Sequence, residues 1–208
     1  MELSLAIFRK ILPVGHPNVA TATSNLGFQY QLAGRYEDAE KFYKAALDMR
    51  ERAEFPNFEH IAESLNNLAQ IYKRQWRIAE AEPILHRAVA ILVKRQPADH
   101  PELAGTRNKL AQNLYKQSKF AEAEPLFRQA LAAWRKPQNA GNTELSATLS
   151  DLASNLVQQN KLDEAEALFD EALVLTKAVL PPSHPSIARV HMGLSDVHVL
   201  RGDSRSAL

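Results

Sequence analysis

Histidine and glutamate are the residue types in this chain whose spacing could support metal or acid–base chemistry. His16, His100 and His184 each precede a proline and lie 84 residues apart. Packed helices lie about 8–10 Å apart, so the helices expected between these histidines keep them from sharing a metal ion. The sequence contains no His-x-x-x-His or Glu-x-x-His pair. We therefore predict structural roles for the histidines and no metal site.

Four glutamates also recur in register, at Glu40, Glu82, Glu124 and Glu166. Each occurs near the expected start of a helix, where an acidic side chain complements the helix dipole. We interpret them as structural and not as catalytic carboxylates. The seven glycines form no dinucleotide-binding or phosphate-binding loop. The sequence thus predicts a protein that is not an enzyme and needs no cofactor.

Composition excludes several classes of partner. The 25 basic and 24 acidic residues give a net charge of +1, without the basic excess usual in nucleic-acid binders. No stretch approaches the roughly 18–20 apolar residues that a membrane span needs. An acid at position 2, with no small-residue cleavage site after it, argues against a signal peptide. The chain has no cysteine, which fits a reducing compartment. We expect a cytoplasmic protein.

An internal repeat of 42 residues decides the fold class. The positions at this spacing keep the same residue character through the chain, with small or apolar side chains in most of them. Such self-similarity is the signature of a repeat architecture. The clearest such columns are Leu26, Leu68, Leu110, Leu152 and Leu194, then Ala39, Ala81, Ala123, Ala165 and Ala207, then Ala46, Ala88, Ala130 and Ala172.

Each repeat is expected to fold as two amphipathic helices. In the first repeat, Val19, Thr23, Leu26 and Tyr30 follow the helical spacing of three and four residues. One such pair cannot bury its apolar face alone, so neighbouring repeats must stack. We predict an all-α, right-handed superhelical solenoid of antiparallel helix pairs. The array would run as a single domain over 1–208, with a partial repeat at 1–15, full repeats at 16–57, 58–99, 100–141 and 142–183, and a partial repeat at 184–208.

Two features depart from a regular closed array. Trp76 occupies the turn position held elsewhere by Gly34, Ser118, Asn160 and Gly202. A left-handed backbone suits tryptophan poorly, so we expect that turn to differ. Neither end of the chain shows the polar capping repeat that solenoids normally carry. Either the chain is part of a longer array, which we favour, or its ends stack on another copy.

Several segments resemble a known repeat family. His16–Ala20, Gly34–Glu40, Ser64–Ala69, Lys119–Phe127 and Lys161–Glu166 are similar to the 42-residue tetratricopeptide repeat (TPR) of kinesin light chains and their prokaryotic relatives. The resemblance covers nearly the whole chain. It implies that the first helix of each repeat lines a concave groove that holds an extended or helical peptide.

The TPR positions, carried over to this sequence, name the candidate groove residues. Amide side chains are frequent among them, and amides can pair with any peptide backbone. Asn25, Asn66, Asn67 and Asn108 could form a ladder, or instead brace neighbouring helices. The lysines and arginines in the middle of the groove favour an acidic peptide, although a solvated surface without ligand preference is equally compatible. The peptide-binding residues so identified are Asn25, Phe28, Asn66, Asn67, Gln70, Lys73, Arg74, Asn108, Lys109, Gln112, Tyr115, Lys116 and Asp151.

The resulting functional hypothesis is a scaffold that binds a peptide or protein segment in its groove. Two alternatives stay open. The array could be a structural module that forms homo-oligomers through its repeat ends, or it could be the sensor array of a larger multidomain protein. No nucleic-acid or membrane partner is expected.

Overall fold

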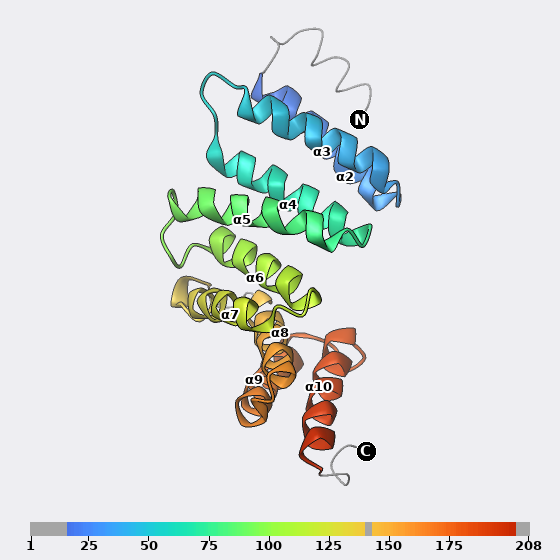
Figure 1. Ribbon diagram of the computed structural model, residues 1–208, viewed down its shortest axis with the longest axis vertical. Coiled ribbons are helices and arrows are strands. Elements are labelled where there is room, and N and C mark those ends of the chain that lie inside the picture. The colour runs from blue at the N-terminus through green and yellow to red at the C-terminus, as the bar shows by residue number, and fades with distance from the viewer. Residues whose placement is uncertain (1–15, 140–142, 203–208) are drawn as a thin grey trace. The chain divides into compact units, whose positions relative to one another are not determined.

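The computed structural model describes residues 16–139 and 143–202, which form nine α-helices, one 3-10 helix and no strand (Figure 1). The chain divides into two compact units, residues 1–96 and 97–208. The predicted partial repeat at 1–15 lies outside the described residues. The all-α fold is therefore as predicted over the described part of the chain.

The helices pair in sequence order within each unit. In the first unit α2 packs on α3 and α4 on α5; in the second α6 packs on α7, α8 on α9, and α10 on α9. The pairs α2–α3, α4–α5, α6–α7 and α8–α9 each lie inside one predicted full repeat, whereas α10 belongs to the following partial repeat. The first unit contains α2 (Pro17–Leu32), α3 (Tyr36–Glu51), α4 (Phe58–Arg74) and α5 (Ile78–Val93), and the second contains α6 (Pro101–Lys116), α7 (Phe120–Trp134), α8 (Glu144–Gln158), α9 (Leu162–Val179) and α10 (Pro185–Arg201).

The recurring His-Pro pairs start three of the first helices. The Nδ1 atoms of His16, His100 and His184 accept hydrogen bonds from backbone N–H groups two residues later, at 3.2, 3.3 and 3.2 Å. Each following proline occupies the first turn, where its missing N–H costs nothing. The structural role predicted for these three histidines is confirmed. Thr143, in contrast, precedes α8 without a side-chain capping bond.

The turn at Trp76 does not differ from its equivalents, so that prediction is wrong. Trp76 has a φ of 61°, close to the 59° of Ser118 and the 58° of Asn160. The following N–H, of Arg77, donates to the carbonyl of Tyr72 at 2.9 Å, as the N–H of Arg35 does to Tyr30. These bonds satisfy the carbonyls at the helix end. These hydrogen bonds, together with the packing of α4 on α5, hold residue 76 in the left-handed conformation even though its side chain is tryptophan.

This strain predicts a stabilising substitution. Trp76→Asn should raise the free energy of unfolding by about 1 kcal/mol, because asparagine tolerates the left-handed backbone and tryptophan does not. Trp76 is 80% exposed, so little packing is lost. Urea denaturation followed by circular dichroism measures the change. Gly34→Ala, at the equivalent turn, is the control. It should lower the free energy of unfolding, because Gly34 has a φ of 74°, which alanine tolerates poorly. A Trp76→Asn protein no more stable than wild type would contradict the argument.

Small and large side chains alternate in the core of each helix pair. The alanine at the second-helix start is fully buried in every pair, which brings the two helices close together. The large ring four residues later fills the space beside it, and is itself 1% exposed in three of the four pairs. The alanines are Ala39, Ala81, Ala123 and Ala165; the rings are Tyr43, Phe127 and Phe169, with Leu85 in the remaining pair.

Candidate functional site

A polar row crosses three first helices of the second unit. Gln112 of α6 donates from Nε2 to Oδ2 of Asp151 on α8, at 2.7 Å. Arg189 of α10 approaches Oδ1 of the same carboxylate at 3.3 Å. The Asp151 side chain is 15% exposed and is thus held between two donors from neighbouring repeats. We call Gln112, Asp151 and Arg189 the polar row.

Tyr115 lies one turn along α6 from this row. Burial raises the pKa of its phenol, and the charges of Asp151 and Asp196 raise it further. Its ring meets Phe120 edge-on, with centroids 5.4 Å apart. The half-buried phenol therefore stays protonated at neutral pH and offers both a ring edge and a hydroxyl to this surface.

Two lysines of α6 flank the polar row. Lys109 and Lys116 are both exposed. Desolvation lowers the pKa of the Lys109 ammonium group, while the charges of Glu144 and Glu102 oppose that shift. The surface of this unit therefore carries both signs of charge, with the carboxylate of Asp151 already paired to Arg189.

The first unit presents its own set of predicted groove residues. On α2, Asn25 is exposed and Phe28 is 47% exposed. On α4, Asn67 is half-buried, and Gln70, Lys73 and Arg74 are exposed.

Two residues of the predicted ladder are placed differently from the expectation. Asn66 and Asn108 are only 6% and 4% exposed, so they do not present their amides to a ligand. Ser24 and Ser150, at the equivalent position, are also buried. Successive residues of a helix are rotated by about 100° around its axis. Asn66 and Asn108 each come one residue before the groove position of their helix, so they face the helix packing instead. Their burial argues against direct contact with a peptide.

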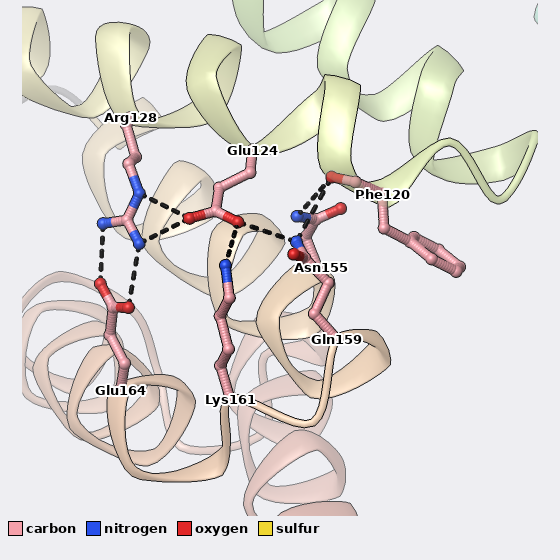
Figure 2. A network of polar contacts seen from close by, with 7 residues as sticks. All are labelled: Phe120, Glu124, Arg128, Asn155, Gln159, Lys161 and Glu164. Atoms are coloured by element: carbon pink, nitrogen blue, oxygen red, sulfur yellow. Dashed lines mark hydrogen bonds and ion pairs between the residues drawn. The ribbon is translucent and has the colours of Figure 1, made fainter.

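Three of the repeated glutamates, Glu40, Glu124 and Glu166, join one repeat to the next, a role that the sequence interpretation missed. Figure 2 shows Glu124 of α7 between Arg128 of its own helix and two residues at the α8–α9 turn. Gln159 and Lys161 reach Oε2 of Glu124 at 2.9 and 2.6 Å. In the first unit Glu40 accepts equivalently from Arg77 at 2.6 Å. The sequence does contain a signal for this contact. A basic residue, Arg77 or Lys161, lies 37 positions after Glu40 or Glu124, at the start of the next second helix.

The same network fixes its own donors. Arg128 makes two parallel hydrogen bonds to Glu164 of α9, at 2.7 and 2.9 Å. Asn155 of α8 donates to the carbonyl of Phe120 at 3.1 Å. Burial opposes ionisation of Glu124, but the hydrogen bonds from Lys161, Arg128 and Gln159 outweigh it and lower its pKa to about 2. The network is a structural brace that connects α7 with α8 and α9.

One position near the end of each second helix varies between repeats and changes the space around it. Trp134 is 3% exposed and packs with Ala104, Ala130 and Ala133, whereas Thr176 occupies the same position one repeat later. A cavity of about 260 Å³ lies beside Thr176, lined also by Ala147, Leu180 and Arg189. In the first unit Arg50 holds this position; it is 7% exposed and donates to Ser64 at 2.6 Å. The residue at this repeated position thus differs between repeats, and the cavity lies beside the small one, Thr176.

Over 16–139 and 143–202, no group of three or more histidine or acidic residues is arranged to hold a metal ion. None of the helices in these ranges combines the length and the apolar character that crossing a membrane requires.

Comparison with protein families identifies the repeat. The family model described as the tetratricopeptide repeat matches residues 1–52, 60–136 and 144–208, which is most of the chain. The chain belongs to the tetratricopeptide repeat family. TPR arrays are scaffolds for protein interaction, built from stacked helix pairs. None of the curated proteins compared with this TPR chain matches it.

Solved structures share the fold. A Podospora anserina protein described as a putative kinesin light chain with nearly identical TPR-like repeats aligns with a TM-score of 0.76 at 22% identity, over 92% of this chain and 91% of that one. BtubC (BKLC) of P. vanneervenii aligns at 0.80 and 19% identity, over 92% and 76%. YrrB, described as a TPR protein with an unusual peptide-binding site, aligns at 0.59 and 18% identity, over 89% and 79%. The kinesin-light-chain-like TPR fold is thus as the sequence resemblance implied.

Proposed function

We propose that this TPR chain is an interaction scaffold, and that the second unit binds an extended peptide or protein segment along α6, α8 and α10. The observation that carries the proposal is the polar row, in which Gln112, Asp151 and Arg189 connect three first helices in succession. A ligand lying across these helices would meet oriented polar groups instead of mobile ones. Preorganisation of this kind reduces the entropy that binding costs.

The chemistry of the surface suits a peptide backbone with one acidic anchor. The Gln112 amide is oriented by its hydrogen bond to Asp151, and primary amides are groups that can pair with a peptide backbone. Tyr115 adds an aromatic edge of the kind that anchors ligands. Lys109 and Lys116 place one cation on each side of Gln112 along α6, so a carboxylate of the ligand would lie beside α6. YrrB, which shares the TPR fold, is described as having an unusual peptide-binding site, which is consistent with this use of the fold.

The first unit is proposed as a separate surface of the same kind. Its exposed or half-buried polar residues on α2 and α4 resemble those of the second unit, with Phe28 as the apolar anchor. Asn66 and Asn108 are left out of the proposal because both are buried. The first-unit residues retained are Asn25, Phe28, Asn67, Gln70, Lys73 and Arg74.

A peptide display library tests the proposal. Peptides enriched on wild-type protein should lose at least about tenfold in affinity for Lys109→Ala, because charge-assisted hydrogen bonds contribute roughly 1.5–3 kcal/mol. Asp151→Asn should also weaken binding, because it removes the charge that orients Gln112 and Arg189. Lys177→Ala is the matched control, since it removes an exposed lysine from the second helix α9. Circular dichroism confirms that each variant is folded.

The outcomes separate the proposal from its alternatives. Enriched peptides that are acidic and sensitive to Lys109→Ala support binding at this row. Enrichment that is indifferent to both groove variants, or equally sensitive to Lys177→Ala, contradicts it. Variants of Lys73 and Arg74 assign any further peptides to the first unit.

Self-association is a second candidate, favoured by one observation on α10. Met192, Val199 and Leu200 are 68%, 61% and 57% exposed, which is an apolar surface on a single helix. Such surfaces mark interaction sites more often than isolated apolar residues do. Sedimentation velocity across a hundredfold range of concentration would show a rising mass that Met192→Ser with Val199→Ser abolishes. A constant monomer mass would exclude this candidate.

A further inference from the structure

A cavity of about 520 Å³ lies on the seam between α6 and α7, away from the polar row. Its floor is formed by Ala132 and Ala133 of α7, and its cations are Arg107 of α6 and Lys136. Ala98, Asp99 and Gln129 complete its lining. We call it the seam cavity. Its volume is within the range of about 300–1,000 Å³ typical of small-molecule sites.

The other repeats explain why this seam is open. Arg107 stands where Leu65 and Leu149 stand, and these leucines are 2% and 0% exposed. Facing it, Ala133 stands where the neighbouring repeats have Ile91 and Leu175. Ile91 packs against the core cluster that contains Leu65. The third repeat therefore lacks two large apolar side chains that meet across the same seam in the second.

Arg107 does not fill the space that leucine would. Its guanidinium turns to the loop and donates from Nη1 to the carbonyl of Ala98 at 3.0 Å. A guanidinium has five N–H donors, and Arg107 forms no ion pair among the described residues. Desolvation lowers the pKa of Arg107, and no carboxylate opposes that shift. Asp99, which also lines the cavity, accepts a hydrogen bond from Gln138 at 2.9 Å.

We propose that the seam cavity binds a small carboxylate with a branched or ring-shaped apolar body. The apolar body would lie on Ala132 and Ala133, in the space that Ile91 and Leu175 take at the position of Ala133 in the neighbouring repeats. The carboxylate would accept hydrogen bonds from the remaining N–H groups of Arg107 and from Lys136. A half-buried cation without an acidic partner favours an anion over a neutral ligand, because the ligand supplies the missing charge.

The probe is 4-methylpentanoate, which joins a leucine-like branched chain to a carboxylate. Saturation-transfer NMR on the full chain should show saturable binding, and 4-methylpentanol should bind at least about tenfold more weakly because it has no charge. A tripeptide ending in leucine carries the same two groups. Comparing the affinities of the tripeptide and 4-methylpentanoate tells whether the ligand is a peptide terminus or a free carboxylate. Saturable binding of either probe supports the site.

The repeat supplies its own variants. Arg107→Leu removes the cation and restores the side chain of Leu65 and Leu149, so it should fold and bind the probe at least about tenfold more weakly. Ala133→Leu keeps the cation but fills the floor, as Leu175 does, and should also abolish binding. Lys177→Leu makes the same change of charge and side chain on α9, outside the cavity, and should bind like wild type.

Two results would overturn the proposal. The proposal would be refuted if neither the acid nor the tripeptide showed saturable binding. It would also be refuted by binding that survives both Arg107→Leu and Ala133→Leu. Thermal unfolding of each variant serves as the folding check, and both are expected to unfold no earlier than wild type because they restore apolar packing at the seam.

Discussion

Gly193→Ala is expected to lower the free energy of unfolding by about 2 kcal/mol. A methyl group on Gly193 of α10 would lie 2.2 Å from Cζ of Phe169 on α9, which is far inside van der Waals contact. Phe169 is 1% exposed, so its ring has no free space to enter. Either the ring leaves its rotamer or α10 moves off α9. Urea denaturation measures the loss, and amide hydrogen exchange should place it in α10.

A second substitution should rescue the first. Leu85 occupies the position of Phe169 in the second repeat, so Phe169→Leu is a replacement that the repeat already accommodates. In a double-mutant cycle, Gly193→Ala should cost at least about 1 kcal/mol less when Phe169 is leucine. Gly105→Ala is the matched control, because its new methyl would lie 3.9 Å from Trp134, an ordinary contact. Equal costs of Gly193→Ala in both backgrounds would refute the clash.

Glu124→Gln is expected to destabilise the second unit by about 2 kcal/mol at pH 7. Glutamine keeps the shape of the side chain but loses the charge that Lys161, Arg128 and Gln159 stabilise. Glu124 itself is only 15% exposed, whereas Arg128 and Lys161 are 44% and 45% exposed, so solvent screening reduces the full value that the pKa shift implies. Glu122→Gln, an exposed glutamate on the same turn, should change stability by less than about 0.5 kcal/mol.

The difference between wild type and Glu124→Gln should depend on pH with a definite sign. In the folded protein the pKa of Glu124 is lowered from its usual 4.5 to about 2. The stabilisation is therefore complete above the pH at which an unfolded glutamate ionises, and is lost as pH falls from about 5 to 2. Denaturation midpoints measured at pH 7 and near pH 2.5 test this. A difference that does not shrink in acid would show that the brace acts without the charge.

Local rules account for the parts of the protein that the sequence predicted well. The 42-residue period repeats the same helix pair, and caps such as His100-Pro101 depend only on neighbouring residues. The buried alanines at the second-helix starts follow from helical spacing alone. Features of this kind need no knowledge of which repeats touch, so periodicity and capping chemistry are sufficient.

The candidate site was predicted only in part. Helical periodicity places Asp151 and Lys109 in one column, but it does not show that Asp151 is paired with Arg189 and Gln112. Nor does it distinguish Asn67, which is half-buried, from its neighbour Asn66, which is buried. One step along a helix turns a side chain by about 100°, and whether that direction meets solvent depends on what packs there.

What the sequence by itself determined is thus the repeating unit: two helices, their limits and their apolar faces, since these obey rules that act within a few residues. The tertiary structure decided what the unit does at each place. It made Glu124 a brace between repeats, kept Trp76 in a left-handed turn, and opened the seam cavity at Arg107. Those outcomes depend on side chains about 30 to 40 positions apart meeting in space, or on hydrogen bonds that close only when helices pack. Their energies are decided by packing and desolvation, which the order of residues alone does not express.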